Sequence, residues 1–600
     1  MMSLLWWILI GFLAYWVGLA AVNRAGYLPA SVNVSGPLIT IHTTRGRALL
    51  ERLSAPKRFW RAWGNFGVGI ALIIMAGMFL VVVQAAIASL FSPERTEITE
   101  PQNVLVIPGV NEFLPLSAAP EIVAGLLVGL IVHEGGHGLL CRVENIEIES
   151  MGVAMIAIIP IGAFVQPEEE TQLKADRGGK TRMFAAGVMN NFVITLIAFA
   201  VLFWIVAALI VPAPGAAIGG TLDGSAAADA GIGPGDRIVA VDGTTIENAS
   251  TFESYLEAST ADTVEVELGS GDILTVNRSL LVVGAVPDGP ANLSTGERIT
   301  AVDGEAVATE AAFIDTLEDR PVATVSTADA EYTFPTGALL GQVSPDGPFA
   351  DAGIPTESDV SPVVTAIDDE RVVTSEDAQA VLERTEPGQE IEVEVYLVEA
   401  GESISPDVEP ETYTVELDEH PAGHGLMGVQ IQEGVTGLMV NDFGARLYPT
   451  ERFYATLGGD TDADSIFGLD TFFGKIFSAM LLPIAALMDM GLQQNFAGFT
   501  GHVTEFYETS LGFAGADFLI FLAANVLFWV GWINFNLGIF NCIPAFPLDG
   551  GHLLRSSTEA IVSRLPIDNA YIATKYVTVS IGLLMLISLI LMIFGQGLLA

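Results

Sequence analysis

Two histidines and a glutamate lie within five residues of each other in an otherwise apolar run. Residues 129–140 read GLIVHEGGHGLL, and His133, Glu134 and His137 are the ionisable groups in it. Positions i and i+4 share one face of a helix, so both imidazoles can bind one metal ion while the glutamate lies beside it. A zinc ion lowers the pKa of its bound water to about 7, and a neighbouring carboxylate can accept the proton. The spacing indicates metal-assisted hydrolysis, although pore or proton-relay groups of a transporter also place such residues in apolar helices.

A hydrolytic zinc site needs a third protein ligand and keeps one position open for water. Residues 541–554 read NCIPAFPLDGGHLL, in which Asp549 follows an apolar helix within a Pro-Pro-Gly-Gly context that ends the helix. Irregular backbone at membrane depth is tolerated only where it is buried in protein or lines a cavity. We therefore expect Asp549 to turn inward and join the two histidines. We expect His552 to stay outside the ligand set, because the open position is needed for water.

These motifs need membrane helices to position them. The chain has 600 residues, 51% of them hydrophobic, with a mean hydropathy of +0.51, which is too apolar for an ordinary soluble protein. The sequence predicts a polytopic α-helical membrane protein of about six transmembrane helices. The predicted helices lie near 4–22, 66–91, 119–141, 184–211, 514–540 and 574–598. The first is interpreted as a retained helix and not a cleaved signal, because MMSLLWW has no basic start.

The basic residues predict the orientation. The loop between the first two predicted helices carries seven Arg and Lys against one acid, Glu51, which places that loop in the cytoplasm. The helix with HEGGH then runs inward, its site lies near the cytoplasmic side, and residues 213–465 lie outside. The short apolar segment 476–492 contains Pro483 and is expected to lie on the outer membrane face without crossing. The helix at 514–540 then also runs inward and brings Asp549 to the depth of the histidines.

Residues 213–465 are strongly acidic. They hold 49 Asp and Glu against 8 Arg and no Lys, in a chain whose net charge is −46. An acidic surface for cationic partners is one interpretation, but the acidity is diffuse and not clustered. Adaptation to high salt explains it better, and we expect the source to be a halophilic archaeon. Nothing in this composition indicates a nucleic-acid partner.

The same segment repeats itself. GSAAADAGIGPGDRIVAVDGTTI (224–246) is followed by similar stretches at 288–307 and 346–372. Each has a turn region, an alternating strand and a tight turn, which predicts tandem copies of one small fold. The first copy resembles the PDZ domain of membrane and periplasmic proteases, in which A-G-[LI]-x-x-G-D-x-I-x-x-[VI]-[DN]-G recurs. The second copy lacks the A-G-I element, and the third has Asp369 in place of glycine.

The motifs together resemble the site-2 protease family of intramembrane zinc metalloproteases. HEGGH is followed far downstream by N-x-x-P-x-x-x-x-D-G, here Asn541 to Gly550. AAGVMNN (185–191) is similar to the family's A-G-P-x-x-N, with Val188 where proline is usual, and MIAIIPIGAFVQPEEE (155–170) is similar to its membrane-embedded β-hairpin. The resemblance implies one Zn²⁺ held by His133, His137 and Asp549, with Glu134 as general base and acid. It also implies that Asn191 and Asn541 position substrate or stabilise the oxyanion, although hydrogen bonds between helices would equally explain both.

The expected organisation has seven parts. They are 1–118, two helices with a basic cytoplasmic loop; 119–212, the first catalytic part; 213–280, 281–339 and 340–420, three extracytoplasmic α+β, β-rich PDZ-like repeats; 421–512, a linker and the membrane-surface segment; and 513–600, the second catalytic part with a C-terminal helix.

The expected function is hydrolysis of peptide bonds in or near transmembrane segments of membrane-anchored proteins, in the cell membrane. The hairpin at 151–165 would hold an unwound substrate segment by adding it as a strand. The PDZ-like repeats would bind a peptide or carboxyl terminus, or would act as a size filter, which their divergence favours. A non-catalytic scaffold or chaperone and a metal or proton transporter are the alternatives.

Overall fold

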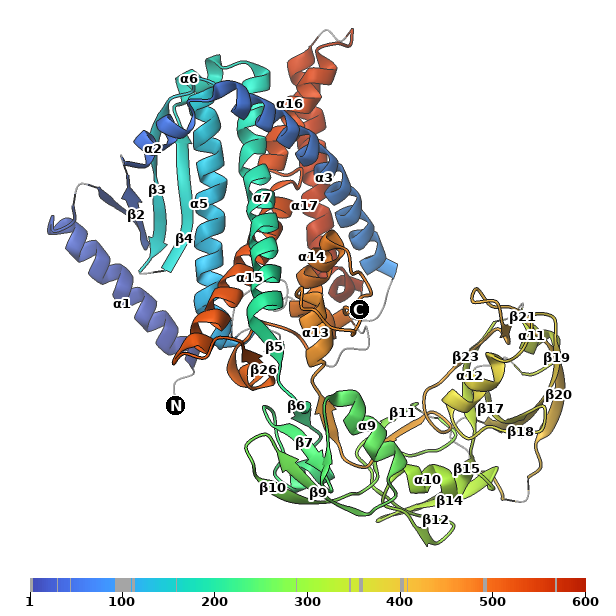
Figure 1. The fold of residues 1–600 in the computed structure, drawn as a ribbon. Coiled ribbons are helices and arrows are strands. Elements are labelled where there is room, and N and C mark those ends of the chain that lie inside the picture. Colours follow the sequence, from blue (N-terminus) through green and yellow to red (C-terminus); the bar gives the residue numbers. More distant parts are fainter. Residues whose placement is uncertain are drawn as a thin grey trace. The chain divides into compact units, whose positions relative to one another are not determined.

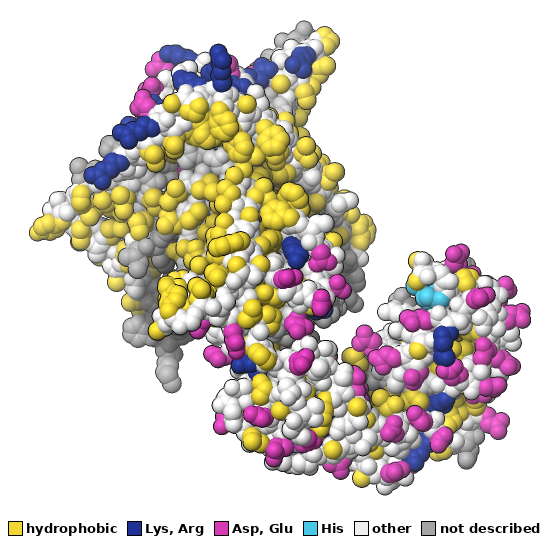
Figure 2. Space-filling model, viewed as in Figure 1, with side chains coloured by type: hydrophobic (Ala, Val, Ile, Leu, Met, Phe, Trp, Pro, Cys, Tyr) yellow, Lys and Arg dark blue, Asp and Glu magenta, His cyan; other side chains and the backbone are white. Residues whose placement is uncertain are grey.

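The computed structural model describes residues 4–599 except 30, 44, 92–108, 110–113, 158, 288, 345–346, 356–359, 400–403, 407, 489–493 and 567–568. The chain forms two compact units (Figure 1). The membrane unit comprises Met1–Pro212 and Glu451–Ala600, and the repeat unit comprises Ala213–Thr450. In Figure 2, hydrophobic side chains cover the flank of the membrane unit, whereas acidic side chains are spread over the repeat unit.

Five helical segments in the described part of the chain are long and apolar enough to cross a membrane. They are α3 (Lys57–Phe91), α5 (Ala119–Val143, extended by the turn from Leu116), α7 (Arg177–Leu209), α15 (Ala516–Asn541) and α17 (Ala570–Leu599). The remaining predicted span, 4–22, coincides with α1 (Leu4–Arg24), and the side chains at its start lie outside the described residues. The prediction of a polytopic helical protein is confirmed, with five candidate spans established.

Helices α5, α7 and α15 pack side by side at the centre of the membrane unit (Figure 1). Small residues allow this close approach. A Cβ added at Gly136 of α5 would lie 2.8 Å from the carbonyl oxygen of Ala186 on α7, and one at Gly125 would lie 2.8 Å from that of Trp529 on α15. Any side chain at either position would therefore force the backbones apart.

A four-stranded sheet lies against α5, with the order β1-β2-β3-β4. Strands β3 (Ile148–Ile156) and β4 (Ile159–Pro167) form the predicted hairpin, followed by the short helix α6 (Glu169–Lys174). Strands β1 (Val32–Ser35) and β2 (Leu38–His42) come from the basic loop that precedes α2 (Arg45–Leu53). Because β2 pairs along β3, β4 is the edge strand on the side of α5.

The short apolar segment expected at the outer membrane face packs within the membrane unit. It forms α14 (Phe472–Leu481) and the 3₁₀ turn η3 (Leu482–Met488). The indole of Trp532 donates to the carbonyl of Met480 at 2.9 Å, and Trp532 is 16 residues into α15, roughly 24 Å along it at 1.5 Å per residue. Part of the segment is buried within the membrane unit, including Ile476, Met480 and Leu482, whereas the aromatic residues Phe472, Phe473 and Phe477 are exposed.

The chain leaves this insertion at the end where it entered. Phe496 donates to the carbonyl of Leu482, and the backbone of Phe499 pairs with the amide of Asn525, seven residues nearer the start of α15. Strand β26 (Tyr507–Thr509) then pairs with β5 (Ile210–Pro212), which follows α7. In the described residues, the chain therefore approaches the middle of α15 at Met480 and lies nearer the start of α15 by Phe499.

The repeat unit contains three small β-rich folds, each with its own hydrophobic core. Their strands fall within 216–277, 281–335 and 338–416. The first two ranges lie inside the expected repeats 213–280 and 281–339, whereas the third begins two residues before the expected boundary at 340. The first comprises β6 (Ala216–Thr221), β7 (Arg237–Val241), β8 (Thr244–Thr245), β9 (Thr263–Leu268) and β10 (Ile273–Asn277), with α8 (Ala226–Asp229) and α9 (Ala249–Ala258). The second comprises β11 (Leu281–Ala285), β12 (Ile299–Val302), β13 (Glu305–Ala306), β14 (Val322–Thr327) and β15 (Glu331–Pro335), with α10 (Glu310–Leu317). The third comprises β16 (Ala338–Val343), β17 (Val360–Ile367), β18 (Glu370–Arg371), β19 (Glu390–Glu399) and β20 (Glu411–Glu416), with α11 (Pro348–Asp351) and α12 (Ser375–Leu382).

A returning segment, residues 429–447, completes all three folds. Its strand β23 (Val429–Ile431) pairs with β16 of the third repeat, β24 (Leu438–Asn441) with β11 of the second, and β25 (Ala445–Leu447) with β6 of the first. The sequence pattern instead predicts these residues as part of a linker, 421–512. Their strands are too short and irregular for periodicity to reveal them, and their partners are far away in the sequence.

A buried ion pair ties the returning segment to the first two repeats. Arg278 Nη2 lies 2.5 Å from Asp442 Oδ2, and both side chains are almost fully buried. The same carboxylate accepts the backbone N–H of Glu310, the first residue of α10, at 2.7 Å. Burial and the neighbouring carboxylate of Asp442 raise the pKa of Glu310 to about 7.

Candidate active site

Helix α5 brings His133 and His137 together on its buried face. Their Nε2 atoms lie 3.2 Å apart. Asp549 Oδ2 lies 3.1 Å from Nε2 of His133 and 3.2 Å from Nε2 of His137. These three residues form the single group of three or more potential metal ligands found in the described part of the chain. The structure therefore places the three predicted ligands together, although they are separated by more than 400 residues.

Asp549 reaches the histidines because α15 ends in a tight turn. Asp549 is the first residue of α16 (Asp549–Val562), and the turn between the two helices contains the apolar, buried Cys542 and Ile543. A Cβ at Gly550 would lie 2.3 Å from the carbonyl oxygen of Ile543. The glycine after Asp549 thus permits the close turn that the Pro-Pro-Gly-Gly context predicted.

The donor set fits a divalent zinc ion. Two imidazole nitrogens and a carboxylate oxygen converge on one point. Among the described residues, Asp549 Oδ2 has no hydrogen-bond partner. Such a buried cluster of lone pairs needs a shared positive charge. The Nδ1–H of His137 donates to the carbonyl of Met183 at 2.8 Å, which leaves Nε2 free to bind a metal.

Asn191 holds the other histidine. Its carboxamide is fully buried and its Nδ2 lies 3.2 Å from Nδ1 of His133, while its Oδ1 has no hydrogen-bond partner in the described structure. A 180° rotation of the amide, which exchanges the positions of Oδ1 and Nδ2, lets Oδ1 accept the His133 Nδ1–H. This arrangement satisfies both groups and orients His133 Nε2 toward Asp549, so Asn191 contacts a ligand of the site and not only a neighbouring helix.

Gly187 of α7 forms one wall of the cluster. A Cβ at this position would lie 2.7 Å from His137 Nε2 and 2.9 Å from His133 Cε1. The glycine in AAGVMNN thus gives the two imidazoles their space.

Glu134 lies beside the ligands and faces the sheet. Its Oε2 accepts the backbone N–H of Val165 on β4 at 2.9 Å. Because Val165 donates away from β3, the alternate residues of this edge strand present their backbone groups to the same side as Glu134. The other carboxylate oxygen of Glu134 is not engaged by Val165. Nothing in the sequence pattern identified Val165, because its contribution is a backbone group.

Two further predicted or considered residues lie outside the ligand cluster. The amide of Asn541 donates to the carbonyl of Leu537 in its own helix at 2.9 Å. The ring of His552 stacks on Phe184, with centroids 4.2 Å apart and planes 3° from parallel. His552 therefore packs beside the site and is not one of the converging ligands, as expected.

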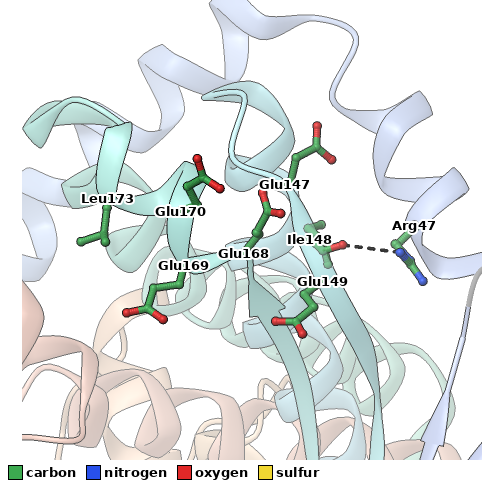
Figure 3. Close-up of a pocket in the computed structure, with 8 residues that line it drawn as sticks. All are labelled: Arg47, Glu147, Ile148, Glu149, Glu168, Glu169, Glu170 and Leu173. Carbon is green, nitrogen blue, oxygen red and sulfur yellow. Dashed lines mark hydrogen bonds between the residues drawn. The ribbon is translucent and has the colours of Figure 1, made fainter.

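A separate acidic hollow of about 740 Å³ lies at the end of the hairpin. It is lined by Arg47, Ile148, Leu173 and five glutamates, Glu147, Glu149, Glu168, Glu169 and Glu170 (Figure 3). Two of these carboxylates are paired with cations, Glu147 with Arg142 and Glu170 with Lys174. The labelled carboxylates point in different directions and do not converge as the histidine and aspartate ligands do (Figure 3).

Comparisons with known proteins support the chemistry of this site. The family model described as Peptidase family M50 matches residues 121–589. An uncharacterized protein of Methanocaldococcus jannaschii is 28% identical over 192 residues, which cover 32% of this chain and 48% of that protein. The zinc metalloprotease RasP of Oceanobacillus iheyensis is 28% identical over 225 residues, 37% of this chain and 44% of that protein. The chain thus spans about half the length of these curated relatives.

Proposed function

The chain belongs to peptidase family M50, and we propose that it is an intramembrane zinc metalloendopeptidase that cleaves membrane-anchored proteins in or near their transmembrane segments. The observation that carries the proposal is the convergence of His133, His137 and Asp549 with Glu134 beside them, on a helix apolar enough to span a bilayer. A non-catalytic scaffold does not require three metal ligands together with a neighbouring general base. A transporter relay would distribute such groups across the membrane and would not gather them at one point.

The ligand residues and Glu134 divide the chemistry between them. His133, His137 and Asp549 would hold the zinc ion, which when bound would supply polarisation of the scissile carbonyl and a water of lowered pKa. Glu134 accepts a proton from the attacking water and passes it to the leaving nitrogen. Met183 and Asn191 hold the two imidazoles in the orientation that the cluster requires. Asn541 remains a candidate for positioning substrate, because its carboxamide oxygen is not used by its bond to Leu537.

Strand β4 is the proposed docking edge for substrate. A transmembrane helix hides its carbonyl groups, so the substrate must unwind before cleavage, and an extended segment gains backbone hydrogen bonds by joining a sheet edge. The N–H of Val165 is already directed at Glu134. A substrate strand that takes this N–H would lie directly beside the general base and would release Glu134 to act on water.

The proposed location is the cell membrane, with the site near the cytoplasmic side and the repeats extracytoplasmic. This orientation rests on the seven Arg and Lys residues between the first two predicted helices. The high acidity also supports a halophilic source. The three repeats are proposed to be PDZ-like, because of the A-G-I-x-x-G-D stretch in the first.

A hollow in the third repeat supports peptide binding by that repeat, in addition to a steric role of the repeats as a group. It measures about 320 Å³ and lies between α12 and the edge strand β23. Leu382, Met427, Val429 and Ile431 give it an apolar lining, and His420 and His424 stand at the same hollow. An extended peptide could pair with β23 and bury a side chain against α12. The size filter remains the role proposed for the repeats as a group.

The test is cleavage of a model single-span substrate by the purified protein, wild type against Glu134→Gln. The variant keeps all three ligands, so zinc content should stay near one per chain, while general-base loss should slow cleavage by about 10²- to 10⁴-fold. Equal cleavage by both proteins would refute the protease proposal. Zinc flux into proteoliposomes that survives Glu134→Gln would favour the transporter instead.

A further inference from the structure

A cationic pocket lies between α16 and α17, outside the catalytic cluster. It has a volume of about 340 Å³. Its charged lining consists of Arg177 from the start of α7, Arg555 and Glu559 from α16, and Lys575 from α17. In a chain with 25 basic and 71 acidic residues, three cations around one carboxylate reverse the general balance. Lys575 is also one of only five lysines.

The single carboxylate of the pocket is already neutralised. Glu559 Oε1 lies 3.3 Å from Arg177 Nη2, and Arg177 also donates to the hydroxyl of Ser563. Arg555 and Lys575, in contrast, form no ion pair or side-chain hydrogen bond with any residue that the structure describes. The pocket therefore presents two uncompensated positive charges.

The donors that remain free come from two different helices. Tyr571 and Lys575 are four residues apart on α17 and share one face, and Arg555 approaches from α16. Tyr571 is 69% exposed. A guanidinium fork, an ammonium group and a phenolic hydroxyl form a suitable donor set for the oxygens of a phosphate.

The surroundings of the pocket distinguish a lipid from a free anion. Phe546 and Val579, both about half exposed, form part of its wall. Val579 begins an outward-facing stripe on α17, a helix apolar enough to span a membrane, and this stripe continues through Leu583, Leu586 and Ile590. The cationic end is thus continuous with a surface that an acyl chain would cover. A free phosphate ion has no apolar part that could cover this surface.

We propose that the pocket binds the phosphate headgroup of an anionic membrane phospholipid, with an acyl chain along the exposed stripe of α17. The headgroup would bridge α16 and α17. Because Asp549 is the first residue of α16, the bound lipid would also hold in place the helix that presents this residue. Basic pockets between membrane helices are suited to such headgroups, since each cation near a membrane surface strengthens binding about fivefold.

Native mass spectrometry of the full-length protein, delipidated in detergent and titrated with phosphatidylglycerol, tests the proposal. Replacing both free cations, as Arg555→Gln with Lys575→Gln, should weaken binding about thirtyfold, from about fivefold for each charge. Arg564→Gln is the matched control, because Arg564 follows α16 but does not line the pocket. It should change the affinity by less than twofold. The charge-conserving double variant Arg555→Lys with Lys575→Arg, which replaces the same two side chains, should retain binding, so loss in the neutral double variant would reflect the lost charges and not the replacement of these side chains.

Two ligand controls complete the test. Phosphatidylcholine, which has the same acyl chains but no net charge, should bind at least tenfold more weakly than phosphatidylglycerol. Inorganic phosphate should neither bind at comparable concentration nor displace the lipid. Equal binding of the two lipids, or undiminished binding by the double variant, would overturn the proposal. Phosphate that binds as tightly as the lipid would also overturn it and would identify a free anion as the ligand.

Discussion

Replacing Gly187 with alanine should strongly weaken zinc binding, although none of the three ligand residues is replaced. The added Cβ would lie 2.7 Å from His137 Nε2 and 2.9 Å from His137 Cε1, whereas carbon atoms pack at about 3.5–4.0 Å. The imidazole or the backbone of α7 would therefore have to move by about 1 Å. Neither moves freely, because His137 is bonded to Met183 and α7 touches α5 at Gly136.

A displacement of this size is large for a metal site, in which ligand distances hold to about 0.2 Å. Loss of a residue that merely orients a ligand costs about 10- to 100-fold in metal affinity, so Gly187→Ala should cost about 100-fold or more. Competition with a chromophoric zinc chelator, with zinc content measured by plasma mass spectrometry, gives this affinity without reference to catalysis.

Gly135→Ala is the matched control. Gly135 lies between the two histidines on α5, and a Cβ there would meet no described atom within 4 Å. This variant should bind zinc normally, and better helix propensity should stabilise it by up to about 1 kcal/mol. If Gly187→Ala binds zinc as tightly as wild type, the packing of α7 against the imidazoles does not constrain the site and the reasoning fails.

Three other perturbations have defined outcomes. Burial raises the pKa of Glu310 to about 7 from 4.5, so the folded repeat unit holds a proton that the unfolded chain releases. The free energy of unfolding should therefore fall by about 2–3 kcal/mol as pH rises from 4.5 to about 7. Glu310→Gln should abolish this pH dependence, measured by amide exchange across residues 213–450, and an unchanged pH dependence would assign it to another group. Arg278→Met should cost about 3–5 kcal/mol by leaving Asp442 buried and unpaired, whereas adding Asp442→Leu should recover much of it, as urea-dependent exchange of the same residues would reveal. Val165→Pro removes the N–H that contacts Glu134 and should slow substrate cleavage about 10- to 100-fold at unchanged zinc content. Val165→Ala keeps the N–H, so its cleavage rate should remain within a few-fold of wild type. Equal cleavage rates for the two variants would exclude a role for this backbone amide.

The sequence predicted the parts of the site that side-chain type and spacing encode. The i, i+4 histidines must share a helix face, and a carboxylate after an apolar helix with Pro and Gly around it had few other uses. The contribution of Val165 could not be read, because every residue except proline has an amide. The role of Asn191 as a partner of His133 could not be separated from helix packing, because both need a buried carboxamide.

The fold was predictable where a local period exists and not where distant segments pair. Apolar runs identified the helices, whereas the hairpin at 151–165 was expected from the resemblance of residues 155–170 to the family's membrane-embedded hairpin and not from a local period. Strand β2 joins β3 across more than 100 residues, a pairing that no local pattern contains. The position of α14 beside α15 could not be predicted for a related reason: an apolar segment shorter than a membrane span fits the membrane surface and a protein interior equally well until its hydrogen bond with Trp532 is known.

The returning segment of the repeat unit also imposes an order on biosynthesis. Strands β23, β24 and β25 complete the repeats in the reverse of the order in which those repeats are made. The first repeat is therefore synthesised first and finished last, after its partner strand at Ala445–Leu447 emerges. Until then its edge strand β6 stays open, and pairings of such long range form slowly. The nascent repeat unit would consequently depend on protection from aggregation for the whole time needed to make these 230 or so residues, and it should fold as a single cooperative event and not repeat by repeat.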